Sequence, residues 1–533
     1  MRNIKLLDCT LRDGAYITGS EFGDASIRGI IAKMVSAGIE IVECGWLKNG
    51  EYKSGTTYFH VPDDLIPYIG KKDKNKVYTV MIDWDRYDLD YLPICDGKSI
   101  DAIRVVFPYG KYTQGLEVAS KVKEKGYRIY LQAANTLAYK DEDLVDLAKK
   151  VNNVAPEALS IVDTFGAMYP EDIERITKIL DTNLDKNIGL GFHSHNNQQL
   201  SFALSMEFAH LLDASERDCV IDGSLCGMGR GAGNATTELV ASFLNRKYDA
   251  HYNLDDIMDA IDTYMESYKE KYEWGYSTPY FIAGMYCCHV NNIAYLLDNH
   301  RTTAKDMRNI IESLSEDDRK KYDYDLLEEK YLKNQSYNVD DSKCVADLKA
   351  EFSGRKILLV APGRSSLDKQ DEIKAFISKE NPVVIGVNSI LNGYDYSYLF
   401  FVNTARYEYA SNSHPEKFET TNHIVLSNVT TDKTENVVGF NSVIKRGWKH
   451  YDNAMICALR LMERLGVKDV YVSGFDGFKN AYNESYADPF LPTLNPGNDW
   501  DGLNKEIKEM YCDFKKGATD INVTFLTQSI YEN

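Results

Sequence analysis

Over roughly the first 245 residues, short runs of β-branched and aromatic residues alternate with longer segments of helical periodicity. This alternation is typical of repeated βα units, which build a parallel sheet. The β-rich runs lie at residues 4–8, 39–43, 77–82, 102–107, 127–132, 158–162, 188–193 and 220–222. Eight strands with intervening helices predict a (β/α)8 TIM barrel, and an open doubly wound sheet is the alternative. The barrel is favoured because polar residues gather just after the strands, where such barrels place their sites.

The rest of the chain has a different pattern. Strand signals stop near residue 250, and the spacing of apolar residues predicts a helical region with a charged linker over 251–350. At 356–360 an apolar run leads into a Gly-containing loop and a helix, which predicts a second, Rossmann-like α/β domain. We therefore expect a catalytic barrel at 1–250, a helical region at 251–350 and a nucleotide-binding-like domain at 351–533.

The charge balance restricts the partners. With 61 basic and 80 acidic residues, the net charge is −19 at pH 7, which repels nucleic acid and anionic lipid. No apolar stretch approaches the roughly 18 residues of a membrane span. The ten Cys are scattered without zinc-ribbon spacing, as expected in a reducing compartment. We expect a cytoplasmic protein that binds neither nucleic acid nor membrane.

Candidate metal ligands follow two predicted strands. Arg12 and Asp13 lie just after the first strand, and a surface ion pair is the common alternative for such neighbours. His193 and His195 end the seventh strand, where a period of two places both rings on one face. Two imidazoles and one carboxylate suit an octahedral divalent ion with open positions, for which Mn²⁺ or Mg²⁺ fits best.

A Gly-rich loop follows the eighth strand, at residues 222–238. Its glycines allow the backbone to approach a ligand closely, and a tight barrel-closing turn explains them equally well. The loop lacks the strand-to-helix fingerprint of a dinucleotide site. We therefore do not expect NAD binding.

Three motifs, at residues 7–14, 193–196 and 229–234, together resemble the metal-dependent TIM-barrel lyase superfamily. This superfamily includes 4-hydroxy-2-oxovalerate aldolase, 3-hydroxy-3-methylglutaryl-CoA lyase and isopropylmalate synthase. The aldolase branch is most similar, since residues 283–286 match it as well. The resemblance extends over roughly the first 310 to 340 residues.

The resemblance assigns roles to individual residues. It implies that the metal is held by Asp13, His193 and His195, with Asn234 as a further ligand carried over from the CoA-lyase branch. It implies that Arg12 stabilises an enolate oxygen and that Glu43 orients Arg12.

Two further positions have competing interpretations. Tyr286 matches a family Tyr that reaches toward the active site, whereas simple packing is the alternative in a chain with 37 Tyr. Thr164, after the sixth strand, is a candidate for binding the substrate carboxylate, and a plain turn is the alternative.

The chain departs from the family at Tyr16, where the aldolases carry a His two residues after the Gly. A phenol with a pKa near 10 is a poor base at neutral pH. Tyr16 is thus an acid–base group with altered tuning, a hydrogen-bond donor to the substrate, or a wall of the pocket.

The C-terminal domain weakly resembles a bacterial sialyltransferase-like fold. In that fold, the positions of Gly363, Ser365 and Asn388 hold a cytidine nucleotide. The transferases use a late His, and this chain has none after His450. A nucleotide-binding, regulatory or interaction role is at least as well supported as glycosyl transfer.

Three functions remain open. The leading hypothesis is a metal-dependent lyase that splits, or forms, a 4-hydroxy-2-oxo acid to give pyruvate or a related 2-oxo acid and an aldehyde. The second is a Claisen-type acyl-CoA condensing enzyme on the same metal site. The third is an idle barrel in a protein that binds or transfers sugar nucleotides. Aldolase relatives deliver their aldehyde to an acylating dehydrogenase, so such a partner is expected, and a homodimer is one candidate oligomeric state.

Overall fold

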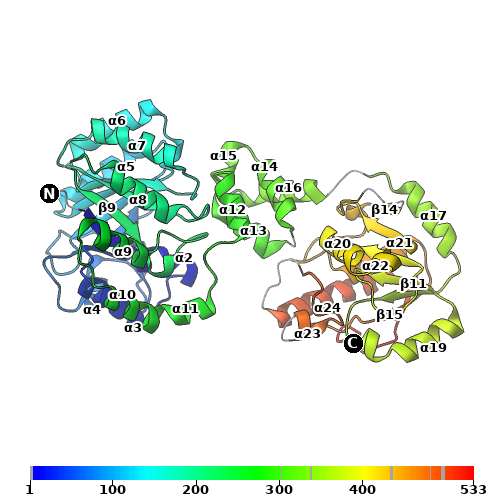
Figure 1. The fold of residues 1–533 in the computed structure, drawn as a ribbon. Coiled ribbons are helices and arrows are strands. Elements are labelled where there is room, and N and C mark those ends of the chain that lie inside the picture. Colours follow the sequence, from blue (N-terminus) through cyan, green and yellow to red (C-terminus); the bar gives the residue numbers. More distant parts are fainter. Residues whose placement is uncertain are drawn as a thin grey trace. The chain divides into compact units, whose positions relative to one another are not determined.

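The computed structural model describes residues 4–215, 217–300, 302–335, 339–431, 436–479, 482–493 and 499–532. The chain divides into two compact units (Figure 1). The first comprises Met1–Val290 and Arg319–Lys321, and the second comprises Asn291–Asp318 and Tyr322–Asn533.

A closed barrel of eight parallel strands forms the first unit. The barrel strands are β1 (Ile4–Asp8), β2 (Ile41–Leu47), β4 (Val77–Asp83), β5 (Ala102–Phe107), β6 (Arg128–Ala133), β7 (Ala158–Asp163), β8 (Gly189–Ser194) and β9 (Cys219–Gly223). The barrel closes where β1 pairs with both β9 and β2, with Leu7 opposite Ile41. A two-residue strand, β3 (Tyr58–Phe59), adds to β2. The predicted TIM barrel is therefore confirmed, and the open sheet is excluded for this unit.

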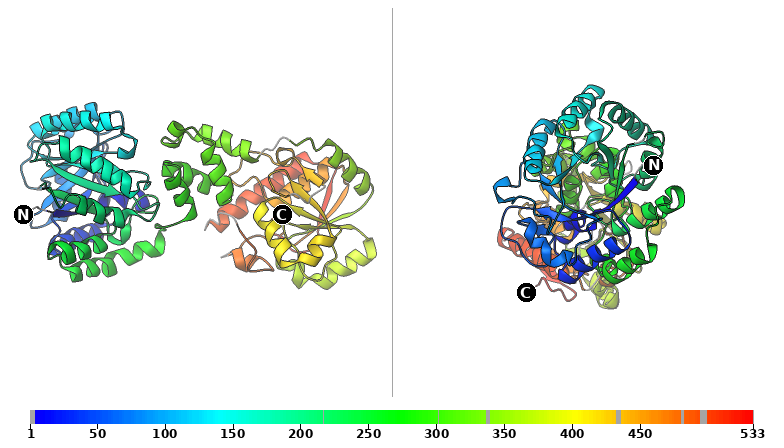
Figure 2. Two further views of the ribbon diagram at one scale, coloured as in Figure 1. Left: turned by 45° about the horizontal axis from the view of Figure 1, so that its top comes forward. Right: turned by 90° about the vertical axis from the view of Figure 1, so that its left-hand side faces the viewer.

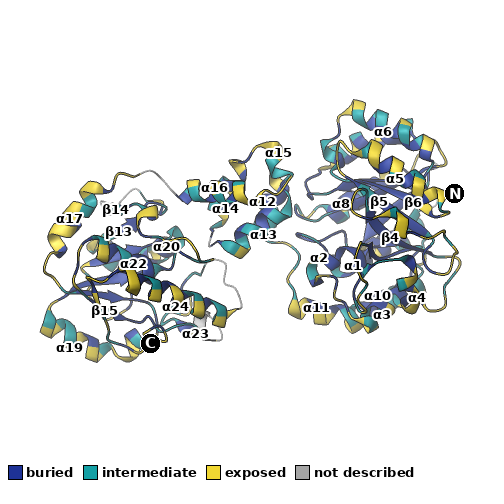
Figure 3. Cartoon of the chain, turned by 180° about the vertical axis from the view of Figure 1, so that it is seen from behind, coloured by how far each residue is buried: buried dark blue, intermediate teal, exposed yellow. Residues whose placement is uncertain are grey.

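Helices cover the outside of the barrel (Figure 2). They are α3 (Asp24–Ser36), α4 (Ile66–Ile69), α5 (Tyr112–Glu124), α6 (Asp141–Val154), α7 (Pro170–Asn183), α8 (Ser201–Leu211) and α9 (Thr237–Tyr248), and two short helices, α1 (Thr10–Asp13) and α2 (Ala15–Thr18), follow β1. Helix α7 shows why they pack: Ile173, Ile176 and Leu180 recur at helical spacing and are buried. Buried strands and helices with exposed outer faces appear in Figure 3.

The inside of the barrel changes character along the strands. An apolar layer near the strand starts includes Leu7, Ile41, Ala102 and Val220. Side chains two residues further along a strand point to the same side, and there the sequence places Glu43, Arg104 and Asp222, all buried. The carboxyl end of the barrel is therefore lined with charged groups that must satisfy one another.

Helices make up the region after the barrel. They are α10 (Leu254–Ala260), α11 (Glu266–Lys271), α12 (Thr278–Met285), α13 (Val290–Asn299), α14 (Ala304–Glu312), α15 (Glu316–Arg319), α16 (Tyr324–Gln335) and α17 (Ser342–Phe352). The described residues between 251 and 350 contain no strand, as the sequence predicts. Of the helices that the structure describes, none combines the length and apolarity needed to cross a membrane.

The second unit contains a sheet of seven parallel strands in the order β14-β13-β12-β11-β10-β15-β16. Their bounds are β10 (Ile357–Val360), β11 (Val383–Val387), β12 (Tyr398–Phe401), β13 (Asn422–Leu426), β14 (Asn436–Val438), β15 (Asp469–Ser473) and β16 (Asn522–Phe525). Figure 2 shows helices on both faces, which are α18 (Ser365–Asp368), α19 (Gln370–Glu380), α20 (Thr404–Ser413), α21 (Pro415–Thr420), α22 (Ala454–Arg464), α23 (Tyr482–Ser485) and α24 (Trp500–Gly517). The strand order reverses between β10 and β15, so this is a doubly wound α/β domain, as predicted.

Candidate metal and active site

A cavity opens at the carboxyl ends of the barrel strands, with about 710 Å³ of empty space including its open mouth. Almost every strand end or following loop contributes to its lining, which includes Arg12, Asp13, Tyr16, Trp46, Asp83, Gln132, Thr164, Phe165, His193, His195, Arg230 and His289. A TIM barrel places its active site at this face. Three of the four sequence-predicted metal ligands, Asp13, His193 and His195, thus lie in one cavity.

Asp13, His193 and His195 form a compact cluster. One ligand atom from each lies within 4.8 Å of the others. The Nε2 atoms of His193 and His195 are 3.8 and 3.7 Å from Asp13 Oδ2. These donors, two imidazoles and a carboxylate on one side, leave positions open for substrate and suit a divalent cation.

Hydrogen bonds on the far side of each ring fix which nitrogen faces the cluster. His195 Nδ1 lies 3.1 Å from the carbonyl oxygen of Asp163, which can only accept, so Nδ1 carries the proton. His193 Nδ1 donates in the same way to Asp222 Oδ2, 3.0 Å away. Burial lowers the pKa of His195 to about 4, so its ring is neutral and its Nε2 lone pair points at Asp13. Metal-binding histidines are oriented by bonds of this kind.

Asp13 is held as a carboxylate. Burial alone would raise its pKa, but Arg12, His195, His193 and a hydrogen bond from Asn234 together lower the pKa of Asp13 to about 2. The cluster therefore presents the charge of Asp13 and the lone pair of His195 at neutral pH. This arrangement attracts a cation.

Asn234 adjoins the cluster from the Gly-rich loop after β9. Its Nδ2 donates to Asp13 Oδ2 at 2.6 Å, and its Oδ1 is buried with no hydrogen-bond partner among the described residues. A buried, unsatisfied oxygen is costly, and a cation would satisfy it. A role as metal ligand requires the amide to turn so that Oδ1 faces the cluster.

Arg12 lies between two carboxylates. Its Nη1 donates to Asp13 Oδ1 at 2.7 Å, and its Nε donates to Glu43 Oε2 at 2.8 Å. The third nitrogen, Nη2, is buried without a hydrogen-bond partner in the described part of the chain. Arg12 thus lines the cavity with an unsatisfied donor, while Glu43 holds its guanidinium in place.

The sequence analysis missed Arg104 and Asp222, the buried groups that support Arg12 and Glu43. Arg104 in β5 donates through Nη1 to Glu43 Oε2 at 2.7 Å and through Nη2 to Asp222, which in turn accepts from His193. The chain of contacts therefore links Arg12 to His193 through buried charges. The available signal was a charged residue at the inward position of an otherwise apolar strand.

Tyr16 lines the cavity and leaves 44% of its surface exposed. The Arg230 guanidinium lies over its ring, 4.9 Å from the centroid. Burial around the phenol raises its pKa, which outweighs the lowering by Arg230. The hydroxyl is therefore protonated at neutral pH, which favours a hydrogen-bond donor or a wall over a base.

Of the two remaining candidate residues, Thr164 lines the cavity and Tyr286 does not. Thr164 lines the cavity, and its Oγ1 accepts from Asn135 N at 2.6 Å, so its hydroxyl proton can be donated elsewhere. Tyr286 does not belong to the cavity lining, and its ring lies under the Arg319 guanidinium. The cavity instead receives His289, three residues later, which the sequence analysis missed. The only sequence signal was a His close to the family-like Tyr.

In the second unit, Gly363 and Asn388 line a cavity at the carboxyl ends of β10 and β11. Ser365 does not line it, because its backbone N–H and its hydroxyl both donate to Asp476. The three predicted nucleotide-binding residues are therefore only partly brought together.

Comparisons with known proteins cover the barrel. The HMGL-like family model matches residues 112–263. Part of the barrel is therefore similar to the HMGL-like family. Over 258 residues, 48% of this chain and 74% of the relative, it is 27% identical to an oxaloacetate decarboxylase of Mycobacterium tuberculosis. Over 326 residues, 59% of this chain and 91% of the relative, it is 24% identical to a 4-hydroxy-2-oxovalerate aldolase of Moorella thermoacetica.

A solved structure, the N-terminal domain of a putative aldolase from Bacteroides vulgatus, is 25% identical with a TM-score of 0.49, covering 54% of this chain and 95% of that one. The relatives that match the barrel include an oxaloacetate decarboxylase and 4-hydroxy-2-oxovalerate aldolases. The resemblance of the C-terminal domain to a sialyltransferase is not borne out. The Ser365 donors that such a fold would turn toward a nucleotide are occupied by Asp476.

Proposed function

We propose that the barrel is a divalent-metal-dependent carbon–carbon lyase that cleaves, or forms, a 4-hydroxy-2-oxo acid, giving pyruvate or a related 2-oxo acid and an aldehyde. The observation that carries the proposal is the Asp13–His193–His195 cluster beside the unsatisfied Arg12 donor at the barrel mouth. The aldolase relatives support the same class of chemistry. Mn²⁺ and Mg²⁺ are the ions we propose.

The donor set fits such an ion, because both imidazoles present Nε2 and Asp13 is charged. A bound divalent ion supplies Lewis-acid polarisation of the carboxylate and keto oxygens of a 2-oxo acid. Arg12 places Nη2 where negative charge develops on the keto oxygen as the C3–C4 bond breaks. Glu43 and Arg104 keep Arg12 from moving. Thr164 is proposed to donate to the substrate carboxylate.

The cleavage of a 4-hydroxy-2-oxo acid also needs a base for the hydroxyl proton on C4. We assign this role to His289, because it lines the cavity and Tyr16 stays protonated. Burial, followed by Arg230 and His195, lowers the pKa of His289 to about 3, so its ring is neutral at neutral pH. The negative charge of a bound 2-oxo acid would raise this pKa toward the range of a general base. The proton leaves the hydroxyl, the electron pair of the O–H bond forms the aldehyde, and the C3–C4 pair enters the enolate.

A second candidate reaction is decarboxylation of oxaloacetate. It is favoured by the oxaloacetate decarboxylase relative and by the replacement of the family His with Tyr16. Loss of CO₂ from a 3-carboxyl group creates the same enolate without removing a hydroxyl proton. The two reactions thus share the metal cluster and Arg12 but differ in their need for a base.

The test is release of pyruvate by the purified full chain. Substrates are a series of 4-hydroxy-2-oxo acids and, separately, oxaloacetate, each with Mn²⁺ or Mg²⁺ and with a chelator. Metal-dependent cleavage of a hydroxy acid supports the aldolase, and turnover of oxaloacetate alone supports the decarboxylase. Acetyl-CoA with a 2-oxo acid is included, because release of free thiol would reveal condensation instead. No metal-dependent product from any of them would contradict the proposal.

An aldehyde-consuming dehydrogenase is proposed as partner on the basis of the aldolase resemblance. A pull-down with the full chain tests it. Failure to recover a dehydrogenase would remove the partner from the proposal without affecting the chemistry of the barrel.

A further inference from the structure

A second cavity lies entirely within the C-terminal unit, with about 810 Å³ of empty space including its open mouth. Its walls come from the carboxyl ends of β10, β11, β12 and β15 and from the start of α22. The strand order reverses between β10 and β15, so the cavity occupies the switch point of the sheet. Open parallel sheets bind their ligands in this crevice. Its size also suits a ligand of a few hundred daltons.

The usual phosphate position at such a switch point is occupied by the protein itself. Phosphates bind there on the N–H groups at the start of the first helix. Here Asp476, in the loop after β15, accepts from Ser365 N at 2.9 Å and from the Ser365 hydroxyl. A Cβ on Gly363 would also collide with this carboxylate and with the Gly474 carbonyl. An anion is therefore repelled from the β10–α18 turn.

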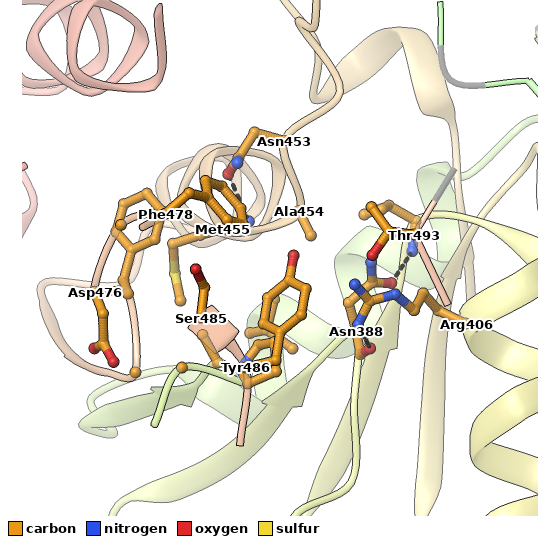
Figure 4. Close-up of a pocket in the computed structure, with 18 of the residues that line it drawn as sticks. Asn388, Arg406, Asn453, Ala454, Met455, Asp476, Phe478, Ser485, Tyr486 and Thr493 are labelled. Carbon is orange, nitrogen blue, oxygen red and sulfur yellow. Dashed lines mark hydrogen bonds between the residues drawn. The ribbon is translucent and has the colours of Figure 1, made fainter. Parts of the chain in front are cut away.

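A positively charged side chain, Arg406, lies on the other side of the cavity. Arg406, in the first turn of α20, is only 5% exposed yet lines the cavity. Its guanidinium lies 4.9 Å from the centroid of the Tyr486 ring, and Nη1 donates to the Asn388 carbonyl at 3.5 Å. Figure 4 shows Arg406 and Asn388 together on one side, across the cavity from Asp476 and Phe478. A buried, positioned guanidinium is the side chain best suited to a phosphate.

Two helices begin at the cavity. The first turn of α20 follows Asn403, whose side chain accepts from Arg406 N at 3.0 Å, and α22 begins at the cavity after Asn453. Both are helices of at least ten residues, and their N-terminal ends carry partial positive charge. Asn403 and Asn453 cap the first N–H groups of these helices, and the Asp452 carboxylate also lines the cavity, so the hydrogen-bond donors open to an anion are those of Arg406.

Aromatic rings supply an apolar wall. Phe478 and Tyr486 lie edge to face with ring centroids 5.8 Å apart, and Pro492 adds to the lining. Flat rings of this kind stack with nucleobases. The cavity therefore combines a place for an anion with a place for a planar group.

We propose that this cavity binds a nucleoside mono- or diphosphate, with its phosphate on Arg406 and its base against Phe478. The phosphate lies away from the Gly363–Ser365 turn. The site is separate from the barrel chemistry and does not depend on the proposed lyase activity.

The experiment is calorimetric titration of the full chain, supported by thermal-shift measurements. Probes are the 5′-mono- and diphosphates of adenosine, guanosine, cytidine and uridine, the four nucleosides, and inorganic phosphate. We expect at least one nucleotide to bind, with its nucleoside and inorganic phosphate at least about tenfold weaker. Arg406→Gln should weaken that nucleotide about 10- to 100-fold. Ser365→Ala is the matched control and should leave the affinity within about twofold, because its hydroxyl already serves Asp476.

Two further variants keep the test decisive. Ala454→Trp fills the cavity from the start of α22 and should abolish binding even if Arg406→Gln does not fold. The His193→Ala, His195→Ala variant should bind the nucleotide normally, which places the site outside the barrel. The proposal is overturned if no nucleotide binds, if nucleoside or inorganic phosphate binds as tightly, if Ala454→Trp binds normally, or if Ser365→Ala loses as much affinity as Arg406→Gln.

Discussion

The barrel mouth and the C-terminal cavity lie at equivalent places in two parallel sheets, yet they collect opposite chemistry. The barrel cavity gathers the Asp13 carboxylate and the rings of His193 and His195, which are donors that suit a cation. The C-terminal cavity holds the buried Arg406 guanidinium, which attracts an anion. The carboxyl ends of parallel strands therefore decide where a site forms, and the side chains that follow them decide which charge it binds.

The largest expected effect comes from removing the cation site. The His193→Ala, His195→Ala variant loses two of three clustered donors, so metal affinity should fall by about 100-fold or more. The value of kcat/KM for pyruvate release should fall about 1000-fold or more, since Lewis-acid assistance contributes several kcal/mol. Metal titration and initial rates measure the two effects. Unchanged metal affinity in the folded variant would show that the barrel cavity is not the cation site, and the contrast with the C-terminal cavity would fail.

Removing the Arg12 guanidinium should lower activity nearly as much. Arg12→Gln deletes the Nη2 donor, and loss of one such donor lowers kcat by about 100- to 1000-fold. The histidines remain, so metal should still bind. Steady-state kinetics at saturating metal provide the measurement. A variant that retains wild-type kcat would show that Arg12 is structural.

The assignment of His289 separates the two candidate reactions. His289→Asn should lower cleavage of a 4-hydroxy-2-oxo acid about 100-fold, as expected for loss of a general base. Decarboxylation of oxaloacetate, which needs no hydroxyl deprotonation, should change little. His251→Asn, at an exposed position of the same unit, is the matched control. Equal losses in both reactions would indicate a structural role for His289.

The smallest effect is expected at Tyr16. Tyr16→Phe removes at most one hydrogen bond to the substrate, so kcat/KM should fall by no more than about tenfold. The profile of kcat against pH should keep its shape, because burial raises the pKa of Tyr16 and the phenol does not titrate near neutrality. Loss of a basic limb from that profile would identify Tyr16 as the acid–base group.

The sequence predicted the parts of the site that follow strands directly. Asp13, His193 and His195 could be placed together because all the parallel strands of a barrel end at the same face. Arg104 and Asp222 were missed because Arg104 in β5 bonds to Glu43 in β2 and to Asp222 in β9, strands that do not neighbour β5 and that only barrel closure brings together. His289 was missed because nothing local shows that the chain after α12 returns to the barrel mouth.

In the second domain, the sequence predicted the parallel sheet. It did not predict which polar side chains line the cavity and which are already bonded within the protein. The loop at Gly363 to Ser366 has the composition of a phosphate-binding turn. Asp476, more than 100 residues later, occupies its donors. Arg406 carries no motif and is recognised only through its burial beside the cavity.

The central claim is that the barrel is a metal-dependent carbon–carbon lyase. Its most direct test is pyruvate release by chelator-treated full-length protein before and after Mn²⁺ or Mg²⁺ is added back. We predict no activity without metal, and restored turnover of a 4-hydroxy-2-oxo acid in wild type but not in the His193→Ala, His195→Ala variant. Pyruvate release that persists in the metal-free protein, or that the double variant retains, would contradict the account.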